Sequence, residues 1–302
     1  MAKLTFLGTG LIGGALAEAA ARRGDQVTVW NRTQSKAEHL RAHGIRIAGS
    51  AAEAAAGAER VHLALPDDAA VDGLLASCGS ALAGAAIIVD HSTASPAGTA
   101  ARAARLAGQG TAFLSAPVFM SPQMCRTAGG LMLVAGPPAV FERAQPGLQQ
   151  MTGTVDYLGE RADLAAAFKL FGNAMILTVT SGLADIFAMA KNLGVSAEAA
   201  HGLFGKFNAA GTIAYRGLAM SKGDYRPSFE LTMARKDARL MLEAAGPQVL
   251  AVLPAIAARL AALIAQGPGA EDLGVLSVGS VPATSAAPPS PPSSPPSKKG
   301  GQ

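Results

Sequence analysis

A glycine pattern near the N-terminus constrains the fold of this chain more than any other feature of the sequence. The apolar run Leu4–Leu7 leads directly into Gly8-x-Gly10-x-x-Gly13, and a second apolar run, Val27–Trp30, follows an alanine-rich helical pattern. This order of strand, glycine turn, helix and strand is typical of the βαβ unit that holds a dinucleotide pyrophosphate. The glycines allow a tight turn and close backbone approach, and the N–H groups of the helix N-terminus face the anion. We therefore predict that the dinucleotide contacts Gly8, Thr9, Gly10, Leu11, Ile12 and Gly13.

The residues after the second apolar run indicate which dinucleotide binds. Sites for NAD usually carry Asp or Glu at this position, which accepts hydrogen bonds from the ribose 2′-hydroxyl. This chain instead has Asn31-Arg32-Thr33, with Lys36 one helical turn further on. The Arg32 guanidinium can hold a 2′-phosphate through charge-assisted hydrogen bonds, and Thr33 can donate another. The alternative is a solvated arginine in a turn. We predict NADP(H) as the cofactor.

Composition and charge exclude several other classes of protein. The chain has 302 residues, of which 50% are hydrophobic and 15% charged, so it is long enough for two globular domains. Its net charge is +4, but the basic residues form no stripe with aromatic residues, so we expect no nucleic-acid partner. Cys78 and Cys125 lack metal-ligand spacing and indicate a reducing, cytoplasmic environment. The apolar stretches 170–190 and 249–265 contain polar residues, and we expect buried helices of a soluble protein there rather than membrane spans.

Apolar runs and helical patterns alternate through the first half of the chain. After the first unit, strands are expected at 61–65, 86–89, 112–114 and 131–134, and helices at 34–43, 68–77, 97–107 and 138–150. Such alternation predicts a doubly wound, Rossmann-like parallel sheet with helices on both faces. We assign this α/β domain to residues 1–160. Ligands of such sheets bind beyond the carboxyl ends of the strands, where Leu65-Pro66 and 90–93 lie.

Strand signals end near residue 160, and helical periodicity replaces them. Helices are expected at 161–191, 196–208, 228–244 and 248–266, so we assign residues 161–275 to an all-α substrate and dimerisation domain. The apolar faces of such a domain need a partner, which predicts a homodimer or tetramer. Residues 276–302 are rich in Pro and Ser and predict a disordered tail. Its Pro-x-x-Pro spacings suit either a docking motif or, more simply, a solvated tail.

Three further segments carry residues suited to chemistry. In the turn 90–96, the Ser92 and Thr93 hydroxyls can bind a substrate carboxylate or the nicotinamide amide, while Ser95 and Pro96 read as the cap and first residue of a helix. Lys169 and Asn173 lie one helical turn apart in an apolar helix. Burial there lowers the pKa of an ammonium and suits it to acid–base work near neutral pH.

The third segment contains Phe229, Leu231, Lys236, Asp237 and Leu240. Considered alone, it is an amphipathic helix with a Lys236–Asp237 pair on its solvated face.

Together the motifs resemble those of the β-hydroxyacid dehydrogenase family, which includes proteins similar to 3-hydroxyisobutyrate dehydrogenase and tartronate semialdehyde reductase. The motifs are GxGxxG, DxSTxxP, APV, GxxxxxxxxxKxxxN and KDxxL, and the resemblance covers residues 3–275. It implies a C-terminal domain like that of 6-phosphogluconate dehydrogenase, with Lys169 as the catalytic acid/base and Asn173 assisting it. It also implies that Thr93, Phe229 and Lys236 contact the cofactor and that Ser92 lies near the substrate.

One segment departs from the family pattern. The family usually has Ala-Pro-Val-Ser-Gly-Gly, where Ser-Gly-Gly holds the substrate carboxylate, whereas this chain has Ala116-Pro117-Val118-Phe119-Met120-Ser121. Phe119 and Met120 impair close backbone approach and predict a more apolar pocket, in which Ser121 remains a candidate donor.

The sequence therefore predicts an NADP(H)-dependent oxidoreductase that transfers hydride between nicotinamide and a small hydroxyacid or semialdehyde. Two alternatives stay open. An imine reductase shares the fold and the cofactor segment, and the apolar 119–120 segment suits it, but such enzymes usually lack the lysine. A non-catalytic NADP(H)-binding protein is the other.

Overall fold

The structure is a computed structural model that describes residues 1–82 and 87–281. The chain forms two compact units, Met1–Met175 and Ile176–Gln302. The division falls inside the long helix α7 (Asp163–Asn192), which runs from the first unit into the second. The predicted tail lies outside the described residues from position 282 onward, and Leu276 and Ser277 belong to a short 3₁₀ helix.

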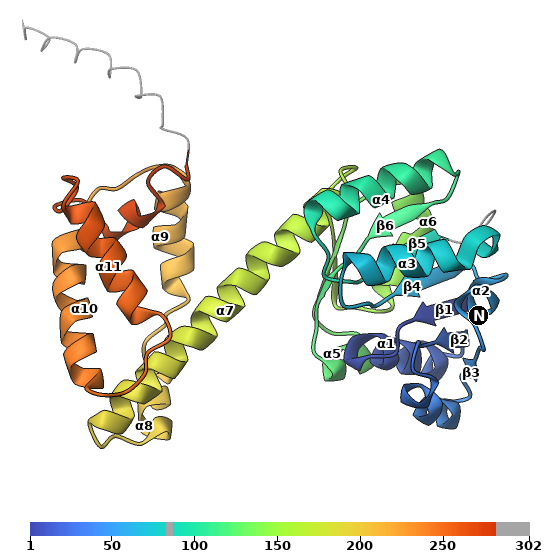
Figure 1. The fold of residues 1–302 in the computed structure, drawn as a ribbon, viewed down its shortest axis with the longest axis horizontal. Helices are drawn as coiled ribbons and strands as arrows, with labels where there is room; N and C mark the ends of the chain where they lie inside the picture. Colours follow the sequence, from blue (N-terminus) through green and yellow to red (C-terminus); the bar gives the residue numbers. More distant parts are fainter. Residues whose placement is uncertain (83–86, 282–302) are drawn as a thin grey trace, which may run out of the picture. The chain divides into compact units, whose positions relative to one another are not determined.

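A six-stranded parallel sheet forms the centre of the first unit (Figure 1). Its strand order is β3-β2-β1-β4-β5-β6. The strands are β1 (Lys3–Leu7), β2 (Gln26–Trp30), β3 (Arg46–Ile47), β4 (Arg60–Leu63), β5 (Ile87–Asp90) and β6 (Phe113–Ser115). Leu4 of β1 pairs with Val27 on one side and Arg60 on the other, so the order reverses at β1. This confirms the predicted Rossmann-like sheet.

Helices cover both faces of this sheet. The relevant helices are α1 (Leu11–Arg22), α2 (Ala51–Ala55), α3 (Asp68–Cys78) and α4 (Pro96–Gly108). Successive side chains of a strand point to opposite faces, so Leu4 and Phe6 pack in the cluster that contains α1, whereas Leu7 packs with α2 and α3. Figure 1 shows α1 on one side of the strands and α3 and α4 on the other.

A second, three-stranded sheet follows in the order β7-β8-β9. Its strands are β7 (Val118–Phe119), β8 (Leu131–Val134) and β9 (Thr154–Tyr157), and the helices between them are α5 (Pro122–Arg126) and α6 (Pro138–Gln149). The sequence correctly indicated a strand at 131–134, but this strand does not extend the parallel sheet. It pairs antiparallel with β7, because the five-residue α5 is too short for the helical crossover that usually joins parallel neighbours.

The segment 34–43, expected as one helix, forms two 3₁₀ helices, Gln34–Lys36 and Glu38–His43. Its buried residues, Ala37 and Leu40, are three positions apart. A 3₁₀ helix places such residues on one face, so this spacing suits the observed structure better than an α-helix. In the first unit the sequence patterns also missed β3, α2, β7, α5 and β9, all of which have five residues or fewer. In the second unit they missed the 11-residue helix α9 (Gly211–Ser221).

The second unit is helical. After α7 come α8 (Ala197–Gly202), a 3₁₀ turn (Leu203–Gly205), α9 (Gly211–Ser221), α10 (Leu231–Ala245), α11 (Leu253–Ile264) and a 3₁₀ helix (Leu273–Ser277). Its core joins Leu231 of α10 to Leu260 and Leu263 of α11. The buried Asp185 carboxylate of α7 accepts hydrogen bonds from the backbone N–H groups of Ala251, Val252 and Leu253, and so caps the start of α11.

Helix α7 differs from expectation. The stretch 170–190 was expected to be buried. In this chain only 6% of an apolar 18-residue window of α7 is buried. By length and composition alone the helix could cross a membrane. Its exposed apolar side chains include Phe171, Ile176 and Leu177, which no other segment of the described chain covers. In α11, by contrast, Ala257, Leu260 and Leu263 are buried as expected.

Candidate active site

The carboxyl ends of the parallel strands meet at one edge of the sheet, and a cavity of about 890 Å³ opens there. It lies entirely in the first unit. The lining residues come from the glycine turn, from the segments after β2, β4 and β5, from α3, and from the β7 segment and α7. They include Gly8, Gly10, Leu11, Ile12, Gly13, Trp30, Asn31, Arg32, Thr33, Lys36, Leu65, Pro66, His91, Ser92, Thr93, Val118, Met120 and Lys169.

The glycine turn has the geometry of a phosphate cradle. Gly8 has φ of +98°, and a Cβ there would overlap the Ala64 carbonyl oxygen. A Cβ on Gly13 would overlap the Gly8 carbonyl and approach Ala64, so residue 13 must also be small. Gly10 is the N-cap of α1, and no side chain accepts hydrogen bonds from the first turn of this helix. The first backbone N–H groups of α1 therefore stay available for an anion. These features fit the pyrophosphate of a dinucleotide.

Asn31 joins this turn to the segment after β2. Its Oδ1 accepts from the Thr9 N–H across 3.1 Å, and its Nδ2 donates to the Thr33 carbonyl across 2.8 Å. Arg32 and Lys36 are exposed beside it and line the cavity. None of the described residues that line the cavity is Asp or Glu. The cavity therefore has a basic end.

The turns after β4 and β5 are held together by Ser92. Its Oγ accepts from the Leu65 N–H across 3.0 Å, and its own N–H donates to Asp90 across 2.9 Å. Both bonds fix the turn, and Ser92 and Thr93 still line the cavity. Ser95 caps α4 by accepting from Gly98, and α4 begins at Pro96, as predicted.

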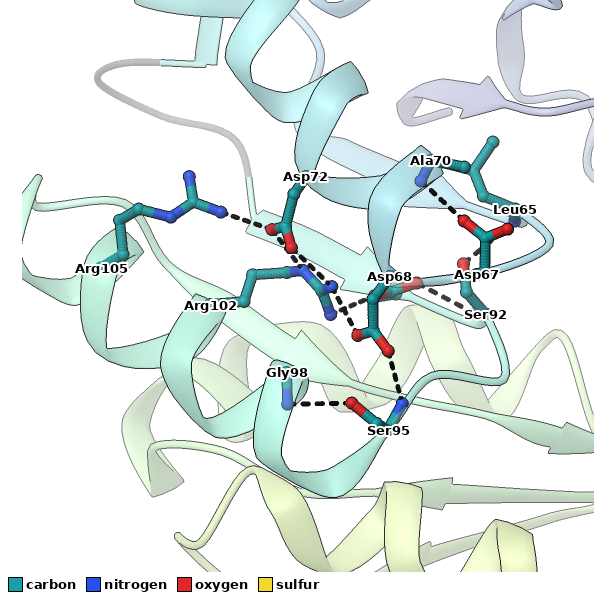
Figure 2. Close-up of polar contacts among 11 residues, drawn as sticks. Leu65, Asp67, Asp68, Ala70, Asp72, Ser92, Ser95, Gly98, Arg102 and Arg105 are labelled. Carbon is teal, nitrogen blue, oxygen red and sulfur yellow. Dashed lines mark hydrogen bonds and ion pairs between the residues drawn. The ribbon is translucent and has the colours of Figure 1, made fainter.

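A buried arginine lies behind these turns. Figure 2 shows the Arg102 guanidinium of α4 between Asp68 and Asp72 of α3. It donates to Asp68 across 2.9 Å and to Asp72 across 3.0 Å, and lies 3.5 Å from Asp90. Asp68 also accepts from the Ser95 N–H. Burial raises the pKa of Asp90, although hydrogen bonds from Ser92 and the charge of Arg102 act in the opposite direction.

Lys169 reaches the cavity from α7. Its Nζ donates to the Val118 carbonyl across 2.8 Å and lies 3.9 Å from the centroid of the Phe119 ring. The side chain is half-buried, and burial lowers the pKa of its ammonium. A lysine with a lowered pKa beside a dinucleotide cradle can donate or accept a proton.

Two buried histidines support the neighbouring backbone. His91 shares a hydrogen bond of 2.7 Å between its Nδ1 and the Ala116 carbonyl, and its Nε2 lies 2.9 Å from Nδ1 of His62. Burial lowers the pKa of His91 to about 4 and the pKa of His62 well below its usual value. Both rings are neutral at neutral pH, so Nδ1 of His91 donates to Ala116 and its Nε2 accepts from His62.

The remaining candidates lie elsewhere. Asn173 is half-buried one turn after Lys169 and is not among the lining residues, and the Ser121 hydroxyl accepts from Met124 as the cap of α5. Phe229 and Lys236 belong to the second unit. The Phe229 N–H donates to Asp272, and Lys236 forms an ion pair of 2.9 Å with Asp237.

Local sequence patterns did not indicate the buried Arg102 or the place of Phe119. Thr99, Arg102 and Leu106 are buried at helical spacing in α4. An arginine on such an apolar face is the signal that could have indicated a buried acidic partner. The expected apolar change in the pocket comes from Met120, which lines the cavity, whereas Phe119 is not among the lining residues.

Comparison with known proteins agrees with this geometry. Residues 3–159 match the family model described as the NAD binding domain of 6-phosphogluconate dehydrogenase. The chain is 31% identical over 266 residues to the uncharacterised oxidoreductase YfjR of Bacillus subtilis, covering 83% of this chain and 89% of that protein. The chain belongs to the β-hydroxyacid dehydrogenase family. It is therefore an NAD(P)-dependent oxidoreductase, as its resemblance implied.

Two further proteins that resemble this chain have names that state an activity. It is 27% identical to glyoxylate/succinic semialdehyde reductase 1 of Arabidopsis thaliana, covering 89% of this chain and 94% of the relative. The structure of an imine reductase from Streptomyces aurantiacus superimposes with a TM-score of 0.82 at 26% identity, covering 88% of this chain and 96% of that one.

Proposed function

We propose that this protein is an NADP(H)-dependent reductase of small aldehydes and oxoacids, working reversibly as a dehydrogenase, with Lys169 as the general acid and base. The observation that carries the proposal is that the Lys169 ammonium and the dinucleotide cradle line the same cavity. A nicotinamide bound there supplies or accepts the hydride. Similarity to a semialdehyde reductase supports the substrate class.

The chain's own residues divide the work between binding and proton transfer. The N-terminus of α1 and the Gly8 turn bind the pyrophosphate, while Thr93 and the Leu65-Pro66 turn contact the nicotinamide side of the cofactor. Ser92 orients the substrate oxygen. Lys169 donates a proton to the oxygen of the carbonyl as it is reduced, and its neutral amine removes the hydroxyl proton in the reverse direction. Asn173, one helical turn after Lys169, assists it.

The choice of NADP(H) rests on the end of β2. Arg32, Thr33 and Lys36 line the basic end of the cavity, and the lining contributes no carboxylate to repel a 2′-phosphate. Arg32 also forms no ion pair with any acidic residue in the part of the chain that the structure describes, so its charge is free for an anion. Each charge-assisted bond to the phosphate contributes about 1.5–3 kcal/mol.

The test is NADPH oxidation by the purified protein with a panel of semialdehydes, 2- and 3-oxoacids and cyclic imines. Lys169→Met should bind NADPH as the unchanged protein does, yet reduce carbonyl substrates about 10²- to 10⁴-fold more slowly. A Lys169→Met variant that turns over at the original rate would disprove the proposal.

The second candidate is imine reduction. It is favoured by the apolar Met120 in the lining and by the likeness to imine reductase structures. Turnover of imines alone in the panel would support it. Tight NADPH binding without turnover of any carbonyl or imine would instead support a non-catalytic NADP(H)-binding protein.

We also propose that the protein is a homodimer in which a second copy covers the exposed apolar residues of α7. Phe171, Ile176 and Leu177 are 64%, 55% and 68% exposed in the single chain, which is unusual for so many neighbouring apolar residues. Light scattering coupled to gel filtration should give twice the chain mass. Replacing Leu177 by Glu should produce monomers, and a monomeric unchanged protein at micromolar concentration would refute the assignment.

A further inference from the structure

Lys169 is held by two groups from the same short strand. The Val118 carbonyl accepts a hydrogen bond of 2.8 Å from Nζ, and the face of the Phe119 ring lies 3.9 Å from Nζ. Both residues form β7, and adjacent residues of a strand point in opposite directions. Val118 and Met120 accordingly line the cavity, while Phe119 does not. The ring therefore contacts the lysine from the side away from the cavity.

The place of the ring depends on a glycine of α7. Gly172 follows Lys169 by three positions and so lies on the same face of the helix. A Cβ on residue 172 would come within 2.6 Å of Cε1 of Phe119 and closer still to Cζ. Any larger residue at 172 would displace the ring from its place beneath Lys169. Phe119 and Gly172 are thus matched in size, although they are far apart in the sequence.

Burial and these contacts have opposite effects on the lysine. Burial disfavours the ammonium and is the cause of its lowered pKa. The face of an aromatic ring attracts a cation, and the attraction is stronger where water is excluded. The Val118 carbonyl also favours the charged form. The ring and the carbonyl therefore replace the acidic partner that a buried ammonium usually needs.

The other titratable groups around Lys169 do not supply such a partner. The strands β7 and β8 contain no titratable residue, and Asp163 at the start of α7 pairs with Arg161. The titratable residues that share the cavity with Lys169 are His91, which is neutral above about pH 4, and the basic Arg32 and Lys36. None of these favours the charged form of the lysine.

We propose that Phe119 is a positioning residue that keeps Lys169 protonated and directed into the cavity, and that Gly172 provides the space it requires. This inference rests on the proposed role of Lys169 as the acid. Its consequence is that the free protein is prepared as a proton donor, and hence for reduction of a carbonyl rather than oxidation of an alcohol. Phe119, which stands where the family pattern has serine, then supports the acid–base chemistry of Lys169.

The direct test is the pKa of Lys169, measured without substrate by competitive acetylation of lysines across a pH series and mass spectrometry. Phe119→Leu keeps an apolar side chain of similar reach but removes the ring face. It should lower the pKa of Lys169 by about 0.5–1.5 units. The acetylation profiles of Lys36 and Lys236 in the same samples should not change. An unchanged or raised pKa of Lys169 in Phe119→Leu would overturn the proposal.

The Gly172 contact gives a second test. Gly172→Ala should lower the melting temperature and also lower the pKa of Lys169, because the ring must move away. The double variant Phe119→Ala/Gly172→Ala should recover stability relative to Gly172→Ala but not the pKa. Gly217→Ala is the control, since its Cβ in the middle of α9 would meet nothing within 4 Å. A Gly172→Ala protein with the original stability and pKa would also overturn the proposal.

The role of Lys169 and the role of Phe119 can be disproved separately. If Lys169→Met keeps full reductase activity, the proposed function fails whatever Phe119→Leu does to the pKa. If Lys169→Met is inactive while Phe119→Leu leaves the pKa of Lys169 unchanged, Lys169 remains the acid and only the role of Phe119 is wrong.

Discussion

The guanidinium of Arg102 donates to the Asp68 carboxylate across 2.9 Å and joins α4 to α3 directly behind the turns that line the cavity. The Arg102 side chain is fully buried, and its guanidinium lies 3.5 Å from the Asp90 carboxylate. Asp90 in turn accepts a hydrogen bond from the Ser92 N–H. One buried cation therefore links two helices to the carboxyl end of β5.

Arg102→Met should destabilise the protein strongly, because it leaves Asp90 buried beside no cation. Removal of one partner from a buried ion pair costs about 3–5 kcal/mol. Chemical denaturation monitored by circular dichroism measures the effect. Arg105→Met is the matched control, since Arg105 contacts the same Asp72 from an exposed position and should cost less than about 1 kcal/mol. Equal losses for the two variants would show that burial of the Arg102 cluster is unimportant.

The reduction rate should depend on the protonation of Lys169. Burial lowers the pKa of its ammonium, so activity in the reduction direction should fall as pH rises through a value below the usual 10.5 for lysine. The oxidation rate should rise through the same value, because oxidation needs the neutral amine. Profiles of kcat/KM between pH 6 and 11 in both directions measure this. Profiles that move in the same direction with pH would contradict the role of Lys169.

Folding stability should decrease in mild acid because His91 is buried and neutral. Burial lowers its pKa to about 4, so below about pH 6.5 the unfolded chain takes up a proton that the folded protein does not. The loss should grow from about pH 6.5 down to about 4 and reach about 3 kcal/mol. Denaturation at pH 7.5 and 4.5 should show a smaller difference for His91→Asn than for the unchanged protein. His39→Asn, at an exposed position, should leave that difference unaltered.

Arg32→Ser should weaken NADPH binding by about 10- to 150-fold, which corresponds to loss of 1.5–3 kcal/mol from one charge-assisted contact to the 2′-phosphate. NADH binding should change little, since it lacks that phosphate. Fluorescence titration with both cofactors gives the two constants. Arg41→Ser tests for a general charge effect, because Arg41 pairs with Glu38 and is not among the lining residues. Equal weakening of both cofactors by Arg32→Ser would argue against a phosphate contact.

Local patterns were sufficient for much of the fold. The run Leu4–Leu7, the Gly8 turn and the following helix form as predicted, because each depends on neighbours within a few residues. The Ser95 cap and Pro96 start of α4 follow for the same reason. The Lys169 segment was recognised from its apolar neighbours and its spacing to Asn173, and the structure brings Lys169 into the same cavity as the glycine turn.

Short elements and long-range contacts were beyond those patterns. The strand β7 has only two residues, and its pairing with β8 removes β8 from the parallel sheet. Helix α7 has the composition of a buried segment, yet burial depends on what packs against it, which its own residues do not specify.

By itself, the sequence determined that this chain forms a dinucleotide cradle at the edge of a parallel sheet and carries a lysine suited to acid–base chemistry. The tertiary structure alone decided which groups surround that lysine and support the turns. Phe119 meets Gly172 and Lys169, and Arg102 meets Asp68, across stretches of chain too long for any local periodicity. Their contacts exist because the sheet and its helices bring distant segments together, and packing there depends on the volume and charge of both partners at once.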